Sequence, residues 1–182
     1  MKSKRILLAL PTILLPYLAL PIPATFILGA GTSAQRNLME SIAQYGLLYI
    51  GVYMLLCILA AATMIIYLVS SIKNNVDAVS LAKMAMVVKL IHIPAYLGIF
   101  VMGFLFSIMI WTYWIAFLLI LLDCFILLLT GALSAASVVN SIRQGKFKMQ
   151  DVIWMIILQN IFCADVVASC VFYWKLKKKQ LA

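Results

Sequence analysis

Residues 111–139 form an apolar run that is long enough to cross a lipid bilayer, and a single carboxylate, Asp123, lies in its middle. A hydrocarbon core about 30 Å thick needs roughly 20 apolar residues in a helix that rises about 1.5 Å per residue. An ionisable side chain at that depth costs roughly 3 kcal/mol or more unless another group pairs with it. We therefore expect the other helices of the chain to surround the Asp123 carboxylate.

The composition indicates an integral membrane protein. Of the 182 residues, 66% are hydrophobic and 10% are charged, and the mean hydropathy of +1.15 is one that a soluble domain of this size could not carry without aggregating. The 14 Lys and Arg residues outnumber the 5 Asp and Glu residues. The basic residues lie mainly at the ends of apolar runs, where membrane topology requires them. We therefore expect the lipid bilayer, and no nucleic acid, as a partner.

The apolar runs predict an all-α, polytopic helical bundle of five transmembrane spans. The expected spans cover residues 6–28, 45–71, 84–110, 111–139 and 152–174. Because the connections between these spans are short, the whole chain, residues 1–182, is expected to form one transmembrane domain without a soluble part.

The first span differs from the others because it contains Pro11, Pro16, Pro21 and Pro23. Each proline removes a backbone donor and crowds the carbonyl four residues before it, so we expect a kinked or broken helix. Freed backbone groups are tolerated in a membrane only against protein or water, so this helix should pack against the others. Its basic start is also typical of a secretory signal, but about 23 apolar residues exceed the usual 7 to 15. We therefore expect a span and not a cleaved leader.

Six polar residues on the last three expected spans form the candidate site. They are Asp123 and Asp165 as acids, Lys89 and His92 as bases, and Gln159 and Asn160 as neutral partners. Two close carboxylates would share a proton, whereas a carboxylate beside His92 or Lys89 would form a buried ion pair. Either arrangement suits proton or cation coupling in a transporter, and a broken helix beside it is typical of transporter binding sites. The alternative is that these side chains pair with one another for a purely structural reason, without transport, because buried polar pairs also fix the register of packed helices.

Lys89, His92 and Tyr96 are spaced so that they share one face of a helix. In one interpretation, Lys89 extends to the membrane interface while His92 hydrogen-bonds a backbone carbonyl. In the other, this face lines a polar cavity. The sequence leaves both open.

The positive-inside rule does not decide the orientation. With five spans and the amino end inside, eight basic residues fall inside, against Arg36 and the four lysines near the carboxyl end. Those eight are Lys2, Lys4, Arg5, Lys73, Lys83, Arg143, Lys146 and Lys148. A four-span alternative, in which the proline-rich segment re-enters without crossing, puts both chain ends inside and again gives a count of eight against five. We favour five spans in the cell membrane with the amino end in the cytoplasm, because early helices usually dominate orientation.

The leading hypothesis is a small transport-related membrane protein that moves, or couples to, a small solute, proton or cation, as a homo-oligomer or with other membrane subunits. The alternative is a non-catalytic scaffold or assembly subunit of a larger membrane complex, which small-residue pairs such as Gly131 and Ala135 favour. An intramembrane enzyme is a second alternative. It is disfavoured because His92 is the only histidine and the chain has no HExxH or GxSxG motif. A lone histidine supplies neither a multi-histidine metal site nor a bis-histidine haem site, and no metal or other cofactor is expected.

Overall fold

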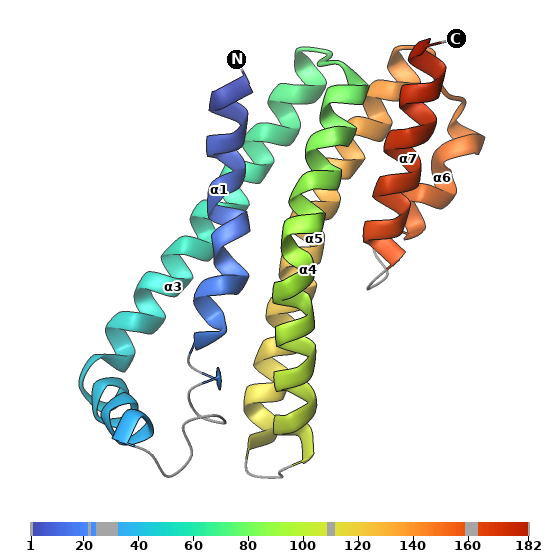
Figure 1. Ribbon diagram of the computed structural model, residues 1–182. Coiled ribbons are helices and arrows are strands. Elements are labelled where there is room, and N and C mark those ends of the chain that lie inside the picture. The colour runs from blue at the N-terminus through green and yellow to red at the C-terminus, as the bar shows by residue number, and fades with distance from the viewer. Residues whose placement is uncertain (1, 22, 25–32, 109–111, 159–163, 182) are drawn as a thin grey trace.

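The computed structural model describes residues 2–21, 23–24, 33–108, 112–158 and 164–181, and within these ranges the chain is helical apart from short turns. The helices are α1 (Lys2–Ala19), α3 (Ser33–Lys73), α4 (Ala78–Ile108), α5 (Tyr113–Arg143), α6 (Met149–Leu158) and α7 (Ala164–Leu181). The described residues contain no strand, so the all-α fold class is confirmed (Figure 1).

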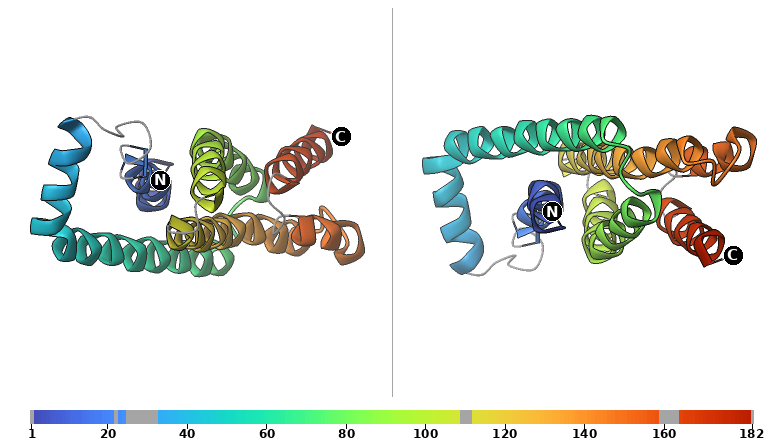
Figure 2. Two further views of the ribbon diagram at one scale, coloured as in Figure 1. Left: turned by 90° about the horizontal axis from the view of Figure 1, so that it is seen from below. Right: turned by 90° about the horizontal axis from the view of Figure 1, so that it is seen from above.

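Three of the described helical segments are long and apolar enough to cross a membrane: Leu47–Lys73 within α3, Ala78–Ile108 (α4) and Tyr113–Arg143 (α5). They correspond to the three middle spans that the sequence predicts. The first part of α3 runs roughly perpendicular to this segment and lies at the outer edge of the bundle (Figure 2).

Five spans are not confirmed, and neither is the kink in the first helix. The helix α1 continues through Pro11 and Pro16 and ends at Ala19. Residues 25–28 of the first expected span lie outside the described residues. The described apolar part of α1, Ala9–Ala19, is shorter than a full span.

The segment 152–174, expected as one helix, is divided between α6 and α7, which lie side by side and run in opposite directions (Figure 1). Lys179, near the end of α7, donates a hydrogen bond of 2.8 Å to the carbonyl of Lys146, just before α6 begins. The chain therefore folds back within this segment. In the sequence, the polar residues Gln159 and Asn160 interrupt the apolar run between the two helices.

The helices form two layers (Figure 2). One layer contains α3, α5 and α6, and the other contains α1, α4 and α7. The helix α4 lies between α1 and α7 and contacts both of them as well as α5.

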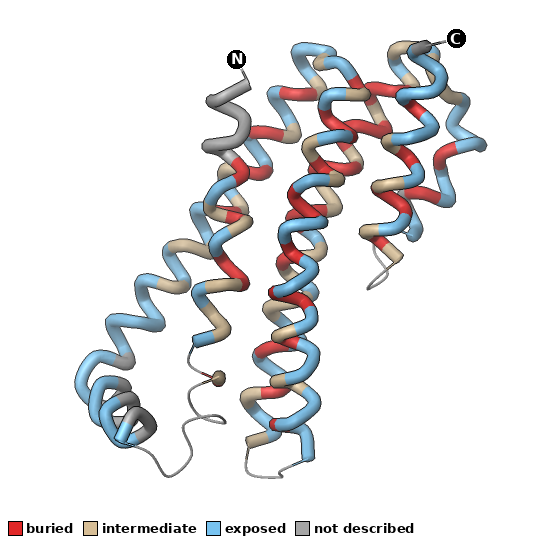
Figure 3. The backbone as a smooth tube through the Cα atoms, viewed as in Figure 1, coloured by how far each residue is buried: buried red, intermediate tan, exposed pale blue. Residues whose placement is uncertain are grey.

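Both chain ends, the α3–α4 turn and the α5–α6 turn lie at one end of the bundle, which we call the terminal end (Figure 1). Buried residues are concentrated in the half of the bundle nearest this end, whereas the far half of α3 is mostly exposed (Figure 3). The main apolar core joins α1, α3, α4 and α5 and includes Leu15, Met64, Leu81 and Leu133. A second core, with Val152, Phe172 and Leu176, holds α6 and α7 against α4 and α5.

Two helices finish at the terminal end in the same way. After α3, Asn75 has a φ of 44° and Val76 N–H donates to the carbonyl of Ser71. After α5, Gly145 has a φ of 68° and Lys146 N–H donates to the carbonyl of Ser141. These are Schellman motifs, in which a residue in the left-handed conformation, most often Gly or Asn, lets the chain close over the last carbonyls of a helix.

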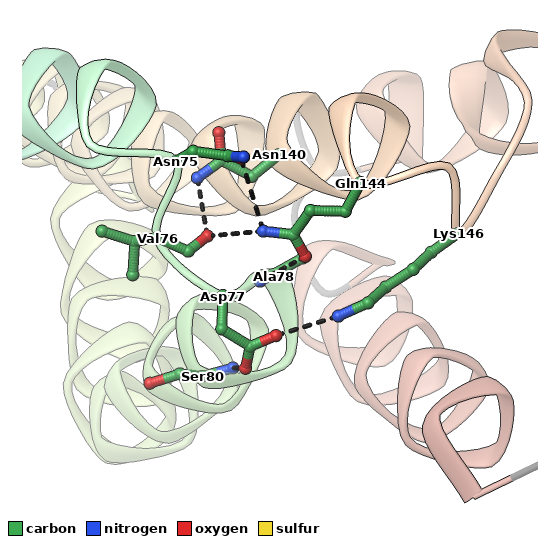
Figure 4. A network of polar contacts seen from close by, with 8 residues as sticks. All are labelled: Asn75, Val76, Asp77, Ala78, Ser80, Asn140, Gln144 and Lys146. Atoms are coloured by element: carbon green, nitrogen blue, oxygen red, sulfur yellow. Dashed lines mark hydrogen bonds and ion pairs between the residues drawn. The ribbon is translucent and has the colours of Figure 1, made fainter.

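Side chains then tie the two turns together (Figure 4). Asn140 donates to the carbonyls of Ser71 and Val76, each at 2.9 Å. Gln144 donates to the Val76 carbonyl at 3.0 Å and accepts from Ala78 N–H at 3.2 Å. Residues at the end of α5 and just after it thus pair with the Val76 carbonyl and the Ala78 N–H of the α3–α4 turn, and they give the Ser71 carbonyl a second donor.

Candidate functional site

A buried ion pair joins α4 to α7. Lys89 Nζ lies 3.3 Å from Asp165 Oδ2, and both side chains are 0% exposed. The ammonium also lies 3.5 Å from the backbone carbonyl of Asp165. Neither carboxylate oxygen of Asp165 accepts a hydrogen bond from the described residues. Lys89 is therefore the principal compensation for this charge that the described structure provides, and removing either partner would leave a buried charge unpaired.

The start of α7 is what places Asp165 in the interior. The helix begins at Ala164, so Asp165 occupies its first turn, where free backbone N–H groups favour negative charge. One turn later, Ser169 Oγ donates to the Asp165 carbonyl at 2.8 Å and lies 3.5 Å from Ser134 Oγ on α5. The sequence analysis did not identify Ser134. The signal that could have identified it is the presence of a hydroxyl residue within the stretch of small residues around Gly131 and Ala135.

His92 makes no ion pair within the described structure, and both of its ring nitrogens face backbone carbonyls. Nδ1 lies 2.7 Å from the carbonyl of Val88 and Nε2 lies 3.2 Å from the carbonyl of Thr12 on α1. The residue four positions after Thr12 is Pro16, which has no N–H to donate to that carbonyl. His92 therefore faces an acceptor that the proline leaves free. This geometry matches the carbonyl-bonding interpretation of His92 and not the cavity-lining one.

Tyrosines of α3 satisfy further carbonyls near the end of α1. Tyr53 donates to the carbonyl of Leu15 at 3.2 Å, and Tyr49 donates to the carbonyl of Leu18 at 2.9 Å. Tyr17, from α1 itself, donates to the carbonyl of Ile91 on α4. The proline-rich helix thus has its polar backbone groups directed at neighbouring helices, as a helix in a lipid environment requires.

Asp123 is not a member of the ion pair and lies in the wall of a cleft between α4 and α5. Its side chain is partly buried, and Oδ1 is fully buried without a hydrogen-bond partner in the described structure. No direct contact joins it to Asp165 among the described residues. The arrangement expected for two carboxylates that share a proton is therefore not seen.

Comparison of the chain with protein family models, with curated protein sequences and with solved structures found no match. Its function is therefore inferred from the geometry of these polar groups alone.

Of the six residues that the sequence predicts as a site, the structure brings Lys89 and Asp165 into direct contact. It places His92 one helical turn from Lys89 on α4, with its ring 5.7 Å from that of Tyr96. Gln159 and Asn160 lie outside the described residues. Within the described part of the chain, no three His, Cys, Asp or Glu side chains gather where they could hold a metal ion.

Proposed function

We propose that this chain is a small transport-related membrane protein in which the Lys89–Asp165 ion pair couples to the movement of a proton or small cation. The observation that carries this proposal is the ion pair itself, fully buried and formed between a long apolar helix and the first turn of a helix that begins inside the bundle. Ionisable residues at membrane depth are costly and are typical of ion and proton pathways.

The depth of the pair supports this proposal. Lys89 follows Ala78, the first residue of α4, by eleven positions, so a rise of about 1.5 Å per residue puts it roughly 16 Å along the helix. The 31 residues of α4 extend over roughly 46 Å at this rise, so a hydrocarbon core about 30 Å thick that is centred on the helix contains Lys89 at roughly 8 Å from its nearer edge. Helices that start or stop near the middle of the membrane are a feature of transporter binding sites, where their free ends contact ions or substrates.

The proposed coupling follows from the opposite charges of Lys89 and Asp165, each of which compensates the other. Protonation of Asp165, or binding of another cation to it, removes the partner of the Lys89 ammonium. A lone buried ammonium is costly, so the α6–α7 pair then shifts relative to α4 or the Lys89 proton leaves. In this way the binding of a proton or another cation to Asp165 is linked to the packing of α7 against α4.

The proposed topology has four crossings. The segment from Lys2 to the start of α3 crosses once, α3, α4 and α5 cross in turn, and α6 and α7 enter from the terminal end and return to it. Every Lys and Arg except Arg36 and Lys89 then lies at or near the terminal end, which the positive-inside rule assigns to the cytoplasm.

One observation favours the second candidate, a non-transporting subunit that packs in a larger complex or with copies of itself. Both side chains of the ion pair are fully buried, and neither residue belongs to the described lining of the α4–α5 cleft. A pair that only fixes the position of α7 against α4 would look the same. This candidate predicts that purification in mild detergent brings other membrane chains along.

Flux of protons or cations into liposomes that contain the purified protein separates the two candidates. The transport proposal expects loss of flux in Asp165→Asn and in Lys89→Gln. The exchanged variant, Lys89→Asp with Asp165→Lys, keeps a pair of opposite charges and should restore folding but not flux. Asp151→Asn, which changes an exposed carboxylate at the start of α6, serves as the matched control. Unchanged flux in both single variants would exclude the proposed role.

A further inference from the structure

The cleft between α4 and α5 has a volume of about 470 Å³, within the range of roughly 300 to 1,000 Å³ that is usual for small-molecule sites. Its walls are mainly aromatic and aliphatic. The residues that matter here are Phe100, Gly103 and Phe104 on α4 and Tyr113, Phe117 and Asp123 on α5. The α4 residues of the cleft lie in the half of that helix farther from the terminal end, and neither Lys89 nor Asp165 belongs to the described lining.

Asp123 gives this apolar cleft one negative group without a matching positive one. No basic residue belongs to the described lining. Lys89, the lysine buried within the bundle, is paired with Asp165. Oδ1 of Asp123 is fully buried and accepts no hydrogen bond from the described residues. Charge complementarity therefore favours a ligand that brings a positive charge into the cleft.

The aromatic lining suits the same ligand. Phe104 and Tyr113 are about three-fifths exposed, at 61% and 60%, so a molecule in the cleft can contact their rings. Aromatic faces attract organic cations, most strongly where water is excluded. A small inorganic cation would leave these rings unused, whereas a bulky apolar cation contacts both the rings and the carboxylate.

We propose that this cleft binds a lipophilic organic monocation, with Asp123 as its counter-ion and the phenylalanine and tyrosine rings around its apolar body. The described lining of the cleft contains neither Lys89 nor Asp165, so this proposal does not depend on the proposed transport function.

Gly103 offers a steric test that leaves the charge in place. A Cβ atom built at Gly103 has no neighbouring atom within 4 Å, and Gly103 belongs to the cleft lining, so a larger side chain there starts in open space at the wall of the cleft. Gly51 on α3 is equally open but lies outside the cleft lining, which makes it a matched control.

The experiment is equilibrium dialysis of radiolabelled tetraphenylphosphonium against the full-length protein in detergent, with protein-free micelles as the blank. We expect saturable binding that unlabelled tetraphenylphosphonium displaces and that tetraphenylborate, an anion of the same shape, does not. Asp123→Asn should weaken binding by about tenfold or more, because it removes one partner of a desolvated charge pair. Gly103→Leu should also weaken binding, whereas Asp123→Glu should retain it.

The controls are Asp151→Asn and Gly51→Leu, which should bind as the wild type does. All variants are compared by size-exclusion chromatography, and Gly103→Leu tests the site even where Asp123→Asn fails to fold. Absence of saturable binding to the wild type would overturn the proposal. Equal competition by tetraphenylborate, or equal binding by Asp123→Asn, would also overturn it, since either result means that the cleft accepts any apolar molecule, including lipid.

Discussion

Lys89 and Asp165 are each 0% exposed and depend on each other for charge compensation. Truncating one member of such a pair leaves an uncompensated buried charge, whereas replacing both by apolar residues removes the problem. We therefore expect Lys89→Met alone or Asp165→Leu alone to lower the free energy of unfolding by about 3 to 5 kcal/mol. The double variant should recover most of that loss. Titration with a denaturing detergent in mixed micelles measures these differences.

The exposed pair of Lys146 and Asp77 is the control for this prediction. Its atoms are 2.9 Å apart, but the two side chains are 22% and 48% exposed. Solvent screening limits such pairs to roughly 1 kcal/mol or less, so Lys146→Met should have a small effect. If the single variants of the buried pair were no less stable than Lys146→Met, the interior placement of the pair would be contradicted.

His92 and Pro16 should be energetically coupled, although they lie on different helices and do not hydrogen-bond to each other. His92→Leu removes the side chain that faces the Thr12 carbonyl and should destabilise the protein by about 1 to 3 kcal/mol, the cost of an unsatisfied buried acceptor. In a Pro16→Ala background, the new N–H of residue 16 can donate to that carbonyl. His92→Leu should therefore cost less in that background, and a double-mutant cycle measures the difference. Strict additivity would show that Thr12 is not the relevant contact.

The chemistry of these residues was predictable from the sequence, but their pairing was not. The cost of a charge in an apolar segment is enough to select Lys89, Asp123 and Asp165. Which of them meet depends on where α7 begins and how the chain folds back before it, and residue spacing does not reveal either. The contact of His92 with Thr12 depends in turn on how α1 is placed against α4.

At the scale of the helix, Asp77 caps the start of α4. Its Oδ2 accepts from Ser80 N–H at 3.0 Å and its Oδ1 pairs with Lys146 at 2.9 Å. Asp77→Ala removes both contacts and should destabilise the protein by about 1 to 2 kcal/mol. Asp77→Asn keeps a capping oxygen and loses only the charge, so its effect should be smaller. Thermal unfolding of the two variants in detergent tests this order, and equal losses would contradict the capping role.

The same carboxylate predicts a pH dependence. Partial burial alone would raise the pKa of Asp77, but the hydrogen bonds from Lys146 and the Ser80 N–H and the charge of Lys146 outweigh it and hold that pKa below the usual 3.8. A carboxyl whose pKa is lower in the folded state stabilises the fold above the unfolded-state pKa. The stability difference between wild type and Asp77→Asn should therefore be constant near neutral pH and shrink as the pH falls below 3.8. A difference that persists at lower pH would contradict it.

The helices that the sequence predicts best are those whose length and apolarity leave few alternatives. The middle three spans fall in this class, because continuous apolar runs of more than 20 residues fit a membrane only as helices. The pair α6 and α7 could not be recognised in this way. Residues 152–174 have the length and apolarity of a single span, and only the polar Gln159 and Asn160 mark the place where the helix is divided.

At the scale of the whole molecule, the direction of α7 decides which side of the membrane the carboxyl end occupies. A fifth crossing would put the lysines of α7 on the side opposite to the amino end and would divide the basic residues eight against five. Lys179 instead contacts Lys146 and Phe147 in the α5–α6 turn, with Nζ 4.2 Å from the centre of the Phe147 ring. With α7 in this position, every basic residue except Arg36 and the buried Lys89 lies at or near the terminal end, and we expect both chain ends to face the cytoplasm.

Labelling of single cysteines in intact cells tests this expectation. In a variant with the native cysteines replaced, Glu40→Cys near the start of α3 should react with a membrane-impermeant thiol reagent. Lys178→Cys on α7 should react only after the cells are permeabilised. Both positions are exposed in the structure, so protection of Lys178→Cys in intact cells reports the membrane and not burial in the protein. A five-span arrangement with the amino end inside predicts that both cysteines react in intact cells, and that result would place α7 across the membrane and break its contact with the α5–α6 turn.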